Sequence, residues 1–282
     1  TAIRLSLLSS ELKAFEFVTR NYVLQSHWSN WTANDGRLPE ASHYPGWFPS
    51  HKVRLFLNAE RVRYSGEIHE LVEPSLKELG WWIERAQIPV HHFAERSPER
   101  LLEKRRLYRK CAEKKVLREP SDAKAFYEHG VHCSETDLYA RAVEAFSEAL
   151  KMAPDFSLRY PGLTNIHAHL SANLIKLSRY QEALSRIDEG LHDSPDNCDL
   201  LHLRGISLIG LGQMKEAIAS LETAVELNPR FSKGWETLGV AHHRAGDHEG
   251  AARSLRRALK LNPSMSEAAR LLKSIPPASN EK

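Results

Sequence analysis

Apolar and small residues in the C-terminal half of the chain recur every 34 positions. Counted from Ser232, an aromatic residue, a leucine and a glycine stand at positions 4, 7 and 8, and small and apolar residues alternate at positions 20, 24 and 27 before a proline at 32. The residues are Trp235, Leu238, Gly239, Ala251, Leu255, Ala258 and Pro263. A fixed period of this length indicates a repeat architecture in which each repeat is one supersecondary unit.

Three earlier copies keep the same pattern. They carry Phe126, Gly130, Ala142, Phe146, Ala149 and Pro154; Leu170, Ala183, Ile187, Gly190 and Pro195; and Leu201, Gly205, Ala217, Leu221, Ala224 and Pro229. The first copy is seven residues out of phase with the second, which predicts an inserted loop at 157–163.

These positions resemble the tetratricopeptide repeat (TPR). The resemblance implies two antiparallel helices per repeat, with small residues at positions 8, 20 and 27 where backbones approach and a proline that ends the second helix. No repeat buries its apolar face alone, so stacked repeats share one continuous core. The fold class we expect is mainly α: a solenoid of four repeats over 123–275 with a capping helix at 266–275, followed by a tail at 276–282.

The TPR resemblance also implies where a ligand binds. In this family the first helices of the repeats form a concave face that binds extended peptides, through positions 2, 5, 9 and 12. Position 2 carries Lys124, Asn165, Asp199 and Lys233 here. The peptide-binding residues we expect are Tyr127, Val131, Asn165, Ala172, His202, Ile206, Glu236, Val240 and His243.

Position 9 of the four repeats is apolar throughout, with Val131, Ala172, Ile206 and Val240. This row differs from the Lys/Asn/Arg clamp that holds a terminal carboxylate. It favours a hydrophobic peptide, a partner domain or a second copy of the chain in a homodimer. The alternative is that these side chains only pack between neighbouring helices.

The first 93 residues follow a different, two-residue period. Alternating aromatic and β-branched residues predict strands at 14–23, 53–57 and 62–70, and a further strand at 81–88 that leads into 89–93. The segment 24–50 is rich in Trp, Pro, Gly and Ser, which predicts an irregular loop. A few short strands do not enclose a sizeable core by themselves. We therefore expect this region to be part of a mixed sheet whose other strands lie elsewhere.

Four segments of this region, taken in order, resemble the second half of a family-2 glycosyltransferase. They are 45–48 (PGWF), 52–58 (KVRLFLN), 66–70 (GEIHE) and 88–93 (IPVHHF). The resemblance implies a small N-terminal α/β segment from a GT-A domain, the fold that binds nucleotide sugars. It covers 45–93 well and 1–44 poorly.

One family motif is absent. Family-2 enzymes hold a divalent metal, Mn²⁺ or Mg²⁺, with an Asp-x-Asp motif, and no Asp-x-Asp occurs in these 282 residues. The resemblance therefore implies a fragment whose nucleotide-binding N-terminal catalytic half is a missing partner. We expect this fragment to bind no cofactor and to transfer no sugar alone, while the full-length parent would use the metal.

The resemblance also points to candidate residues for sugar transfer. Glu70 is the candidate base or acceptor contact and His69 its neighbour, although Glu70 is as readily a surface carboxylate. His92 matches a family histidine that completes the metal site in some relatives; a structural histidine is the alternative. Trp47 and Arg54 are candidate acceptor contacts, with a core tryptophan and a simple ion pair as alternatives.

The segment 94–122 predicts a linker helix. Ser97 is the expected N-cap before Pro98, and the helix runs to about Leu117, with Leu101, Leu102, Leu107, Tyr108 and Cys111 as its packing side. Its many Lys and Arg residues indicate either a patch for phosphate or membrane surfaces or, more simply, a solvated helix, because they spread around most of the axis.

Composition narrows the function classes. A formal net charge of +3 offers no bulk argument for nucleic-acid binding, and no apolar run is long enough to span a membrane. Three separated cysteines without a CxxC pattern predict reduced thiols, and hence a cytoplasmic location. The start, without Met and without a signal-peptide pattern, indicates a cut fragment.

Three functional hypotheses follow. The first is a family-2 glycosyltransferase fragment whose TPR array binds protein or acceptor. The alternative is a non-catalytic TPR scaffold for protein–protein interaction. A third, a metal hydrolase built from His69, Glu70, His91 and His92, lacks the HExxH helix pattern.

Overall fold

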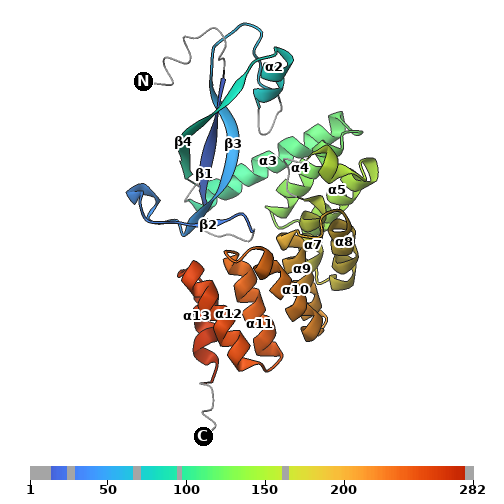
Figure 1. Cartoon of the computed structure of the whole chain (residues 1–282). Coiled ribbons are helices and arrows are strands. Elements are labelled where there is room, and N and C mark those ends of the chain that lie inside the picture. Colours follow the sequence, from blue (N-terminus) through green and yellow to red (C-terminus); the bar gives the residue numbers. More distant parts are fainter. Residues whose placement is uncertain (1–13, 24–28, 66–70, 94–96, 161–164, 277–282) are drawn as a thin grey trace. The chain divides into compact units, whose positions relative to one another are not determined.

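The computed structural model describes residues 14–23, 29–65, 71–93, 97–160 and 165–276. It contains two compact units, which are described separately (Figure 1). The first unit is built around a small sheet and ends before Ser97, and the second contains the helices from Ser97 onward. Ser29 also belongs to the second unit, so the chain enters that unit twice.

The sheet of the first unit has four strands: β1 (Ala14–Val23), β2 (Thr32–Ala33), β3 (Gly46–Phe56) and β4 (Ile83–Phe93). Their order is β2-β3-β1-β4, with β1 antiparallel to β3 and parallel to β4. The sheet is therefore mixed, as expected. The short helix α2 (Glu73–Glu78) covers one end, where Val72 and Leu76 pack with Ala14 and Val53.

The predicted strand at 14–23 is confirmed by β1. The strand predicted at 81–88 begins two residues later and continues through the segment 89–93 as one strand, β4. The loop predicted at 24–50 is wrong in part. It contains β2, a 3₁₀ turn at Pro39–Ala41 and the first half of β3. Pro49 lies inside β3, and this is tolerated because β2 pairs only with Gly46 and Trp47, which leaves β3 an edge strand beyond them in the described sheet.

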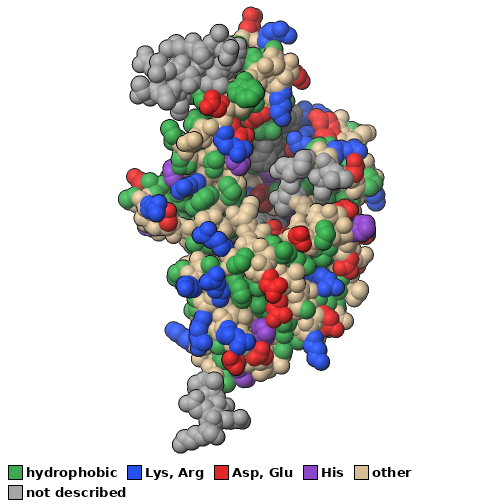
Figure 2. Space-filling model, viewed as in Figure 1, with side chains coloured by type: hydrophobic (Ala, Val, Ile, Leu, Met, Phe, Trp, Pro, Cys, Tyr) green, Lys and Arg blue, Asp and Glu red, His purple; other side chains and the backbone are tan. Residues whose placement is uncertain are grey.

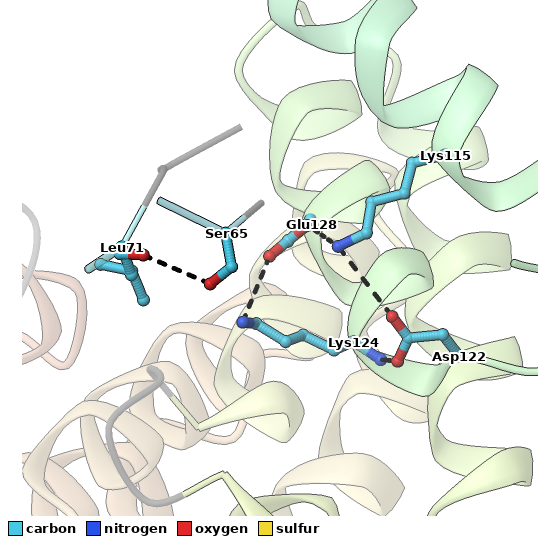
Figure 3. Close-up of polar contacts among 6 residues, drawn as sticks. All are labelled: Ser65, Leu71, Lys115, Asp122, Lys124 and Glu128. Atoms are coloured by element: carbon cyan, nitrogen blue, oxygen red, sulfur yellow. Dashed lines mark hydrogen bonds and ion pairs between the residues drawn. The ribbon is translucent and has the colours of Figure 1, made fainter. Parts of the chain in front are cut away.

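The strand predicted at 62–70 is wrong over its first part. Residues 60 and 61 form a turn, 62–64 have no regular structure, and Ser65 forms an isolated bridge with Leu71. The Ser65 hydroxyl also donates to the Leu71 carbonyl (3.2 Å, Figure 3). The remainder, 66–70, lies outside the described residues.

Four helical hairpins form the second unit (Figure 1). They are α4 (Ala123–Ser134) with α5 (Tyr139–Met152), α7 (Ile166–Lys176) with α8 (Tyr180–Asp193), α9 (Cys198–Gly210) with α10 (Met214–Leu227), and α11 (Ser232–Arg244) with α12 (His248–Leu261). The capping helix α13 (Ser266–Ser274) follows. A short helix, α6 (Phe156–Arg159), occupies part of the predicted loop, and 161–164 lie outside the description.

Small residues bring the two helices of each hairpin together. The alanines at position 20 (Ala142, Ala183, Ala217, Ala251) are fully buried. At position 8, a Cβ added to Gly205 would lie 2.4 Å from Leu221 Cγ, so only glycine fits. The second repeat has Ser171 there, and its hydroxyl donates to the Ala183 carbonyl of the partner helix (3.4 Å). The repeat pattern thus encodes close backbone approach.

Helix α3 (Pro98–Arg118) precedes the hairpins and packs on α4. Its start is the predicted one, because the Ser97 side chain accepts the Arg100 N–H. Its packing side was predicted wrongly at two residues: Leu102 and Leu107 are exposed, at 41% and 58%. Ala112 and Lys115 lie on the packed side of the helix instead. Ala112 is fully buried, and Lys115 has a buried acidic partner on α4.

That partner is Glu128, whose carboxylate lies 2.8 Å from Lys115 Nζ (Figure 3). Lys124 approaches the same carboxylate at 3.8 Å, and Asp122, the N-cap of α4, lies 3.9 Å from Lys115. Burial lowers the pKa of Lys115, but the hydrogen bond and charge of Glu128, with the charges of Asp122 and Glu119, outweigh it and raise the pKa overall. Helix α3 is thereby joined to the first repeat by charge as well as packing.

Within the described ranges, every helix is too short or too polar to cross a lipid bilayer.

Candidate functional site

Successive first helices of the repeats, α4, α7, α9 and α11, contact one another and form a continuous row. Positions 9 and 12 of these helices are all half-buried: Val131, Ala172, Ile206 and Val240, and Ser134, Ile175, Ile209 and His243. We call these eight residues the first-helix surface. They lie three residues apart on each helix and so share one face. The surface is mostly apolar and partly open to solvent.

Position 5, by contrast, is closed. Tyr127, Ala168, His202 and Glu236 are each at most 5% exposed. Tyr127 packs among rings, stacked on Phe156 and edge-on to Phe146. The predicted peptide-binding roles of Tyr127, His202 and Glu236 therefore have no exposed side chain to support them.

His202 is held between the third and fourth repeats. Its Nε2 lies 2.9 Å from the Thr237 hydroxyl, and its ring is edge-on to Phe231. Because the Thr237 hydroxyl donates to the Lys233 carbonyl, Nε2 is the donor in the bond between His202 and Thr237. The histidine therefore links the third repeat to the fourth.

Most side chains at position 2 have a partner on their own helix. Lys233 forms an ion pair with Glu236 one turn later, as Lys124 does with Glu128. Asn165 caps α7 by accepting the His167 N–H at 2.9 Å. Three of the four position-2 residues therefore have local partners.

The fourth, Asp199, binds a residue from far upstream. Ser29 donates its backbone N–H to Asp199 Oδ1 (2.8 Å) and its hydroxyl to Oδ2 (3.1 Å). Asn228, at the end of α10, donates its Nδ2 to the Ser29 carbonyl (2.9 Å). Burial raises the pKa of the Asp199 carboxyl, and the two Ser29 hydrogen bonds partly oppose the rise.

Sequence reasoning placed Asp199 at a ligand-facing position but missed Asn228 and Ser29. Asn228 lies in the turn between two repeats, and an asparagine at such a position is usually interpreted as a helix cap. Ser29 lies 170 residues from Asp199 in the chain, and nothing in its own segment marks the contact.

The acceptor residues predicted in the first unit lie on opposite faces of the sheet. Trp47 packs with Tyr22, Ala41 and Tyr44, and the Arg20 guanidinium lies 4.8 Å from the centre of the Trp47 ring. Arg54 is the extra residue of a β-bulge, and its guanidinium donates to the Thr19 hydroxyl at 3.2 Å.

Alternation along β4 separates its two histidines. His91 Nδ1 lies 3.0 Å from the Tyr22 hydroxyl, on the Trp47 side. His92 pairs with Asn21 and so falls on the side of Thr19 and Arg54. The predicted Glu70 and His69 lie outside the described residues. Among the residues that are described, no three His, Cys, Asp or Glu side chains converge as a metal site would require.

One further surface feature lies on the last hairpin. Lys and Arg side chains gather over α12 and α13 at the lower left of Figure 2. The sequences of these two helices contain Arg253, Arg256, Arg257, Lys260, Arg270 and Lys273, and the acidic residues Glu249 and Glu267. The C-terminal end of the array is therefore basic, although the whole chain is nearly neutral.

A tetratricopeptide repeat family model matches residues 202–272. The helical unit contains tetratricopeptide repeats. The match covers most of the third repeat, the fourth repeat and part of the capping helix. The second hairpin lies one 34-residue period before the third, and the first precedes the second by 34 residues plus the seven-residue insertion.

Several solved structures resemble the chain at low identity. A MamA fragment (41-end) from Desulfovibrio magneticus RS-1 is 24% identical over 58% of this chain and 97% of its own, with a TM-score of 0.47. YrrB, described as a TPR protein with an unusual peptide-binding site, is 20% identical over 61% and 85%, with a TM-score of 0.48. The first TPR of Spaghetti (RPAP3), bound to an HSP90 peptide, is 25% identical over 39% and 87%, with a TM-score of 0.38.

The comparison with curated proteins found no match.

Proposed function

We propose that the helical unit is a protein-interaction module that binds an extended polypeptide along the first-helix surface. The observation that carries this proposal is the pair of half-buried, mostly apolar rows at positions 9 and 12, which cross all four repeats. Apolar side chains left partly open over several repeats are typical of a binding face.

The charges around this surface favour an apolar ligand. Lys124 and Lys233, which would attract a carboxylate, are already paired with Glu128 and Glu236. A ligand therefore gains little from a terminal carboxylate and more from burying apolar side chains against Ile206, Ile209 and Val240. We propose a segment with apolar residues at intervals as the partner class.

The test starts from a displayed library of random peptides of about 15 residues, long enough to span several repeats when extended. The full chain is the bait, and calorimetry measures the selected peptides. We expect Ile206→Glu to weaken binding at least tenfold, because a carboxylate would be desolvated against the apolar ligand. Leu117→Glu, at an exposed leucine of α3, is the matched control and should leave affinity unchanged.

Equal binding to the wild type and Ile206→Glu would refute the proposal. The alternative ligand of the first-helix surface is a second copy of the chain in a homodimer. Sedimentation of the unliganded chain tests for this dimer. Dimerisation lost in Ile206→Glu would replace the peptide by the chain itself as the ligand of this surface.

As a second function, we propose that the first unit is the acceptor-side part of a family-2 glycosyltransferase. Support comes from a mixed sheet with a parallel β1–β4 pair and from His92 at the carboxyl end of β4. Sugar transfer would need a divalent metal, Mn²⁺ or Mg²⁺, and carboxylates to hold it. The three cysteines are free thiols, which supports a cytoplasmic location.

Its test extends the chain upstream by about a hundred codons, the length of a small domain. Uridine and guanosine diphosphates are added with Mn²⁺ in a thermal-shift assay. We expect stabilisation of the extended chain and none of residues 1–282. No shift in the extended chain would leave the non-catalytic scaffold as the better account.

A further inference from the structure

All three polar groups of Ser29 are bound by two side chains of the repeats. Asp199 accepts both its N–H and its hydroxyl, and Asn228 donates to its carbonyl. Ser29 belongs to the same compact unit as these residues although 170 and 199 positions separate it from them. The repeats therefore bind one residue of their own chain as a ligand.

The arrangement recognises the main chain on both sides of one residue. Asp199 supplies an acceptor to the N–H and Asn228 supplies a donor to the C=O, while Ser29 itself lies in a turn. A residue inside a helix, whose N–H and C=O are already used in the helical hydrogen bonds, would offer neither group.

Both side chains are positioned in advance. Asn228 Oδ1 accepts the Arg230 N–H at 3.1 Å, which fixes the amide and leaves Nδ2 to donate outward. Asp199 stands in the first turn of α9, a helix whose N-cap is Asn197. Asp199 is half-buried, and this burial raises the pKa of its carboxyl.

We propose that Asp199 and Asn228 form a main-chain subsite of the peptide-binding array, and that Ser29 occupies it as a built-in ligand. This inference rests on the proposed peptide-binding function, and it identifies an intramolecular contact that would regulate peptide binding. An external segment with a serine at the same place must displace Ser29 first. A tethered ligand acts at an effective concentration in the millimolar range for a short flexible link, so displacement lowers the apparent affinity for external peptides.

The probe is a labelled synthetic peptide with the sequence of residues 25–33 (QSHWSNWTA), titrated against the full chain by fluorescence anisotropy. The Ser29→Pro variant removes the N–H that Asp199 accepts and opens the subsite. We expect it to bind the peptide at least tenfold more tightly than the wild type. Adding Asp199→Ala to the Ser29→Pro variant should remove this gain in affinity for the peptide.

Asn262 provides the matched control for Asn228. It ends α12 one repeat later and closes the same local turn, with its Oδ1 accepting the Ser264 N–H. In the Ser29→Pro background, Asn228→Ala should weaken binding of the peptide, whereas Asn262→Ala should leave it unchanged.

Hydrogen exchange at the Ser29 amide gives a second readout that needs no peptide. We expect slow exchange in the wild type and in Asn262→Ala, and fast exchange in Asp199→Ala. Equal exchange in the wild type and Asp199→Ala, or equal peptide affinity of the wild type and Ser29→Pro, would overturn the inference. Either result would leave the dependence of selected peptides on Ile206 untouched, so the two proposals fail separately.

Discussion

At the scale of single residues, the second unit depends on a few tightly fitted positions. Gly205, His169 and Asp199 each make a specific contact. Gly205 lies against Leu221, His169 is stacked on Phe146 at 5.4 Å, and Asp199 holds Ser29. The repeat pattern indicated the close approach at Gly205 but neither of the other two contacts. The other two depend on neighbours from other repeats or from the far end of the chain.

Gly205→Ala should destabilise the second unit by about 2 kcal/mol, within the range for overpacking, because the new Cβ would lie 2.4 Å from Leu221 Cγ. Urea denaturation measures this change in the free energy of unfolding. In the double variant Gly205→Ala/Leu221→Ala the methyl group enters the space that the leucine leaves. Its destabilisation should be smaller than the sum of the two single changes; a simple sum would contradict the close approach.

His169 should make the stability of the second unit depend on pH. Burial lowers its pKa from 6.5 to about 4, so between these values the unfolded chain binds a proton that the folded chain does not. Stability is therefore complete above pH 6.5 and falls as pH drops toward 4, by about 1–2 kcal/mol at pH 5.

Urea denaturation at pH 7.5 and pH 5 tests this expectation in the wild type and in His169→Phe, which keeps the aromatic stacking. The variant should lose less stability on acidification. Some loss remains, because burial also lowers the pKa values of His129 and His167. His192→Gln, at an exposed histidine, is the control. An identical pH dependence in the wild type and His169→Phe would refute the assignment.

At the scale of elements, the helices were predicted well and the sheet in part. A 34-residue period with buried alanines fixes each hairpin locally, so the four hairpins and the capping helix α13 lie where the repeats were expected, and of α4 to α13 only α6 was not expected as a helix. The strand β1 was found because Ala14–Val23 is rich in aromatic and β-branched residues. The first half of β3 was missed because Gly46 and Pro49 are turn signals, and only pairing with β1 makes this stretch a strand.

The same limit applies to the candidate site. Repeat positions located the first-helix surface, since positions 9 and 12 follow directly from the period. Position 5 was predicted to face a ligand but is filled by contacts between repeats, such as His202 with Phe231 and Thr237. The Asp199–Ser29–Asn228 contact joins segments that share no local pattern, so sequence periodicity alone does not reveal it.

Helix α3 provides the prediction at this scale. Removing the Glu128 carboxylate by Glu128→Ala leaves Lys115 with only its longer contact to Asp122, and should destabilise the second unit by about 2–4 kcal/mol in urea denaturation. The double variant Lys115→Met/Glu128→Leu should recover most of this loss, because it leaves no buried unpaired charge.

Glu148→Ala breaks an exposed ion pair with Lys151 and serves as the control, with an expected effect of at most about 0.5 kcal/mol. If Glu128→Ala changes stability no more than Glu148→Ala does, then α3 is a solvated linker rather than part of the array.

At the scale of the whole molecule, the chain consists of a small mixed-sheet unit and a stack of helical hairpins with α3 and α13 at its two ends. Stacked repeats contact only their neighbours and leave one long face of first helices. That geometry suits an extended partner. The basic helices α12 and α13 add a local charge at the C-terminal end, where an acidic flank of a ligand would gain affinity that falls with added salt.

The central claim is that this face of first helices binds polypeptide, and hydrogen exchange with and without a selected peptide tests it most directly. The account predicts that added peptide slows amide exchange in α9 and α11, which carry Ile206 and Val240, and leaves α10 and α12 unchanged. Slowing confined to the second helices of the repeats, or to the strands of the first unit, would contradict it.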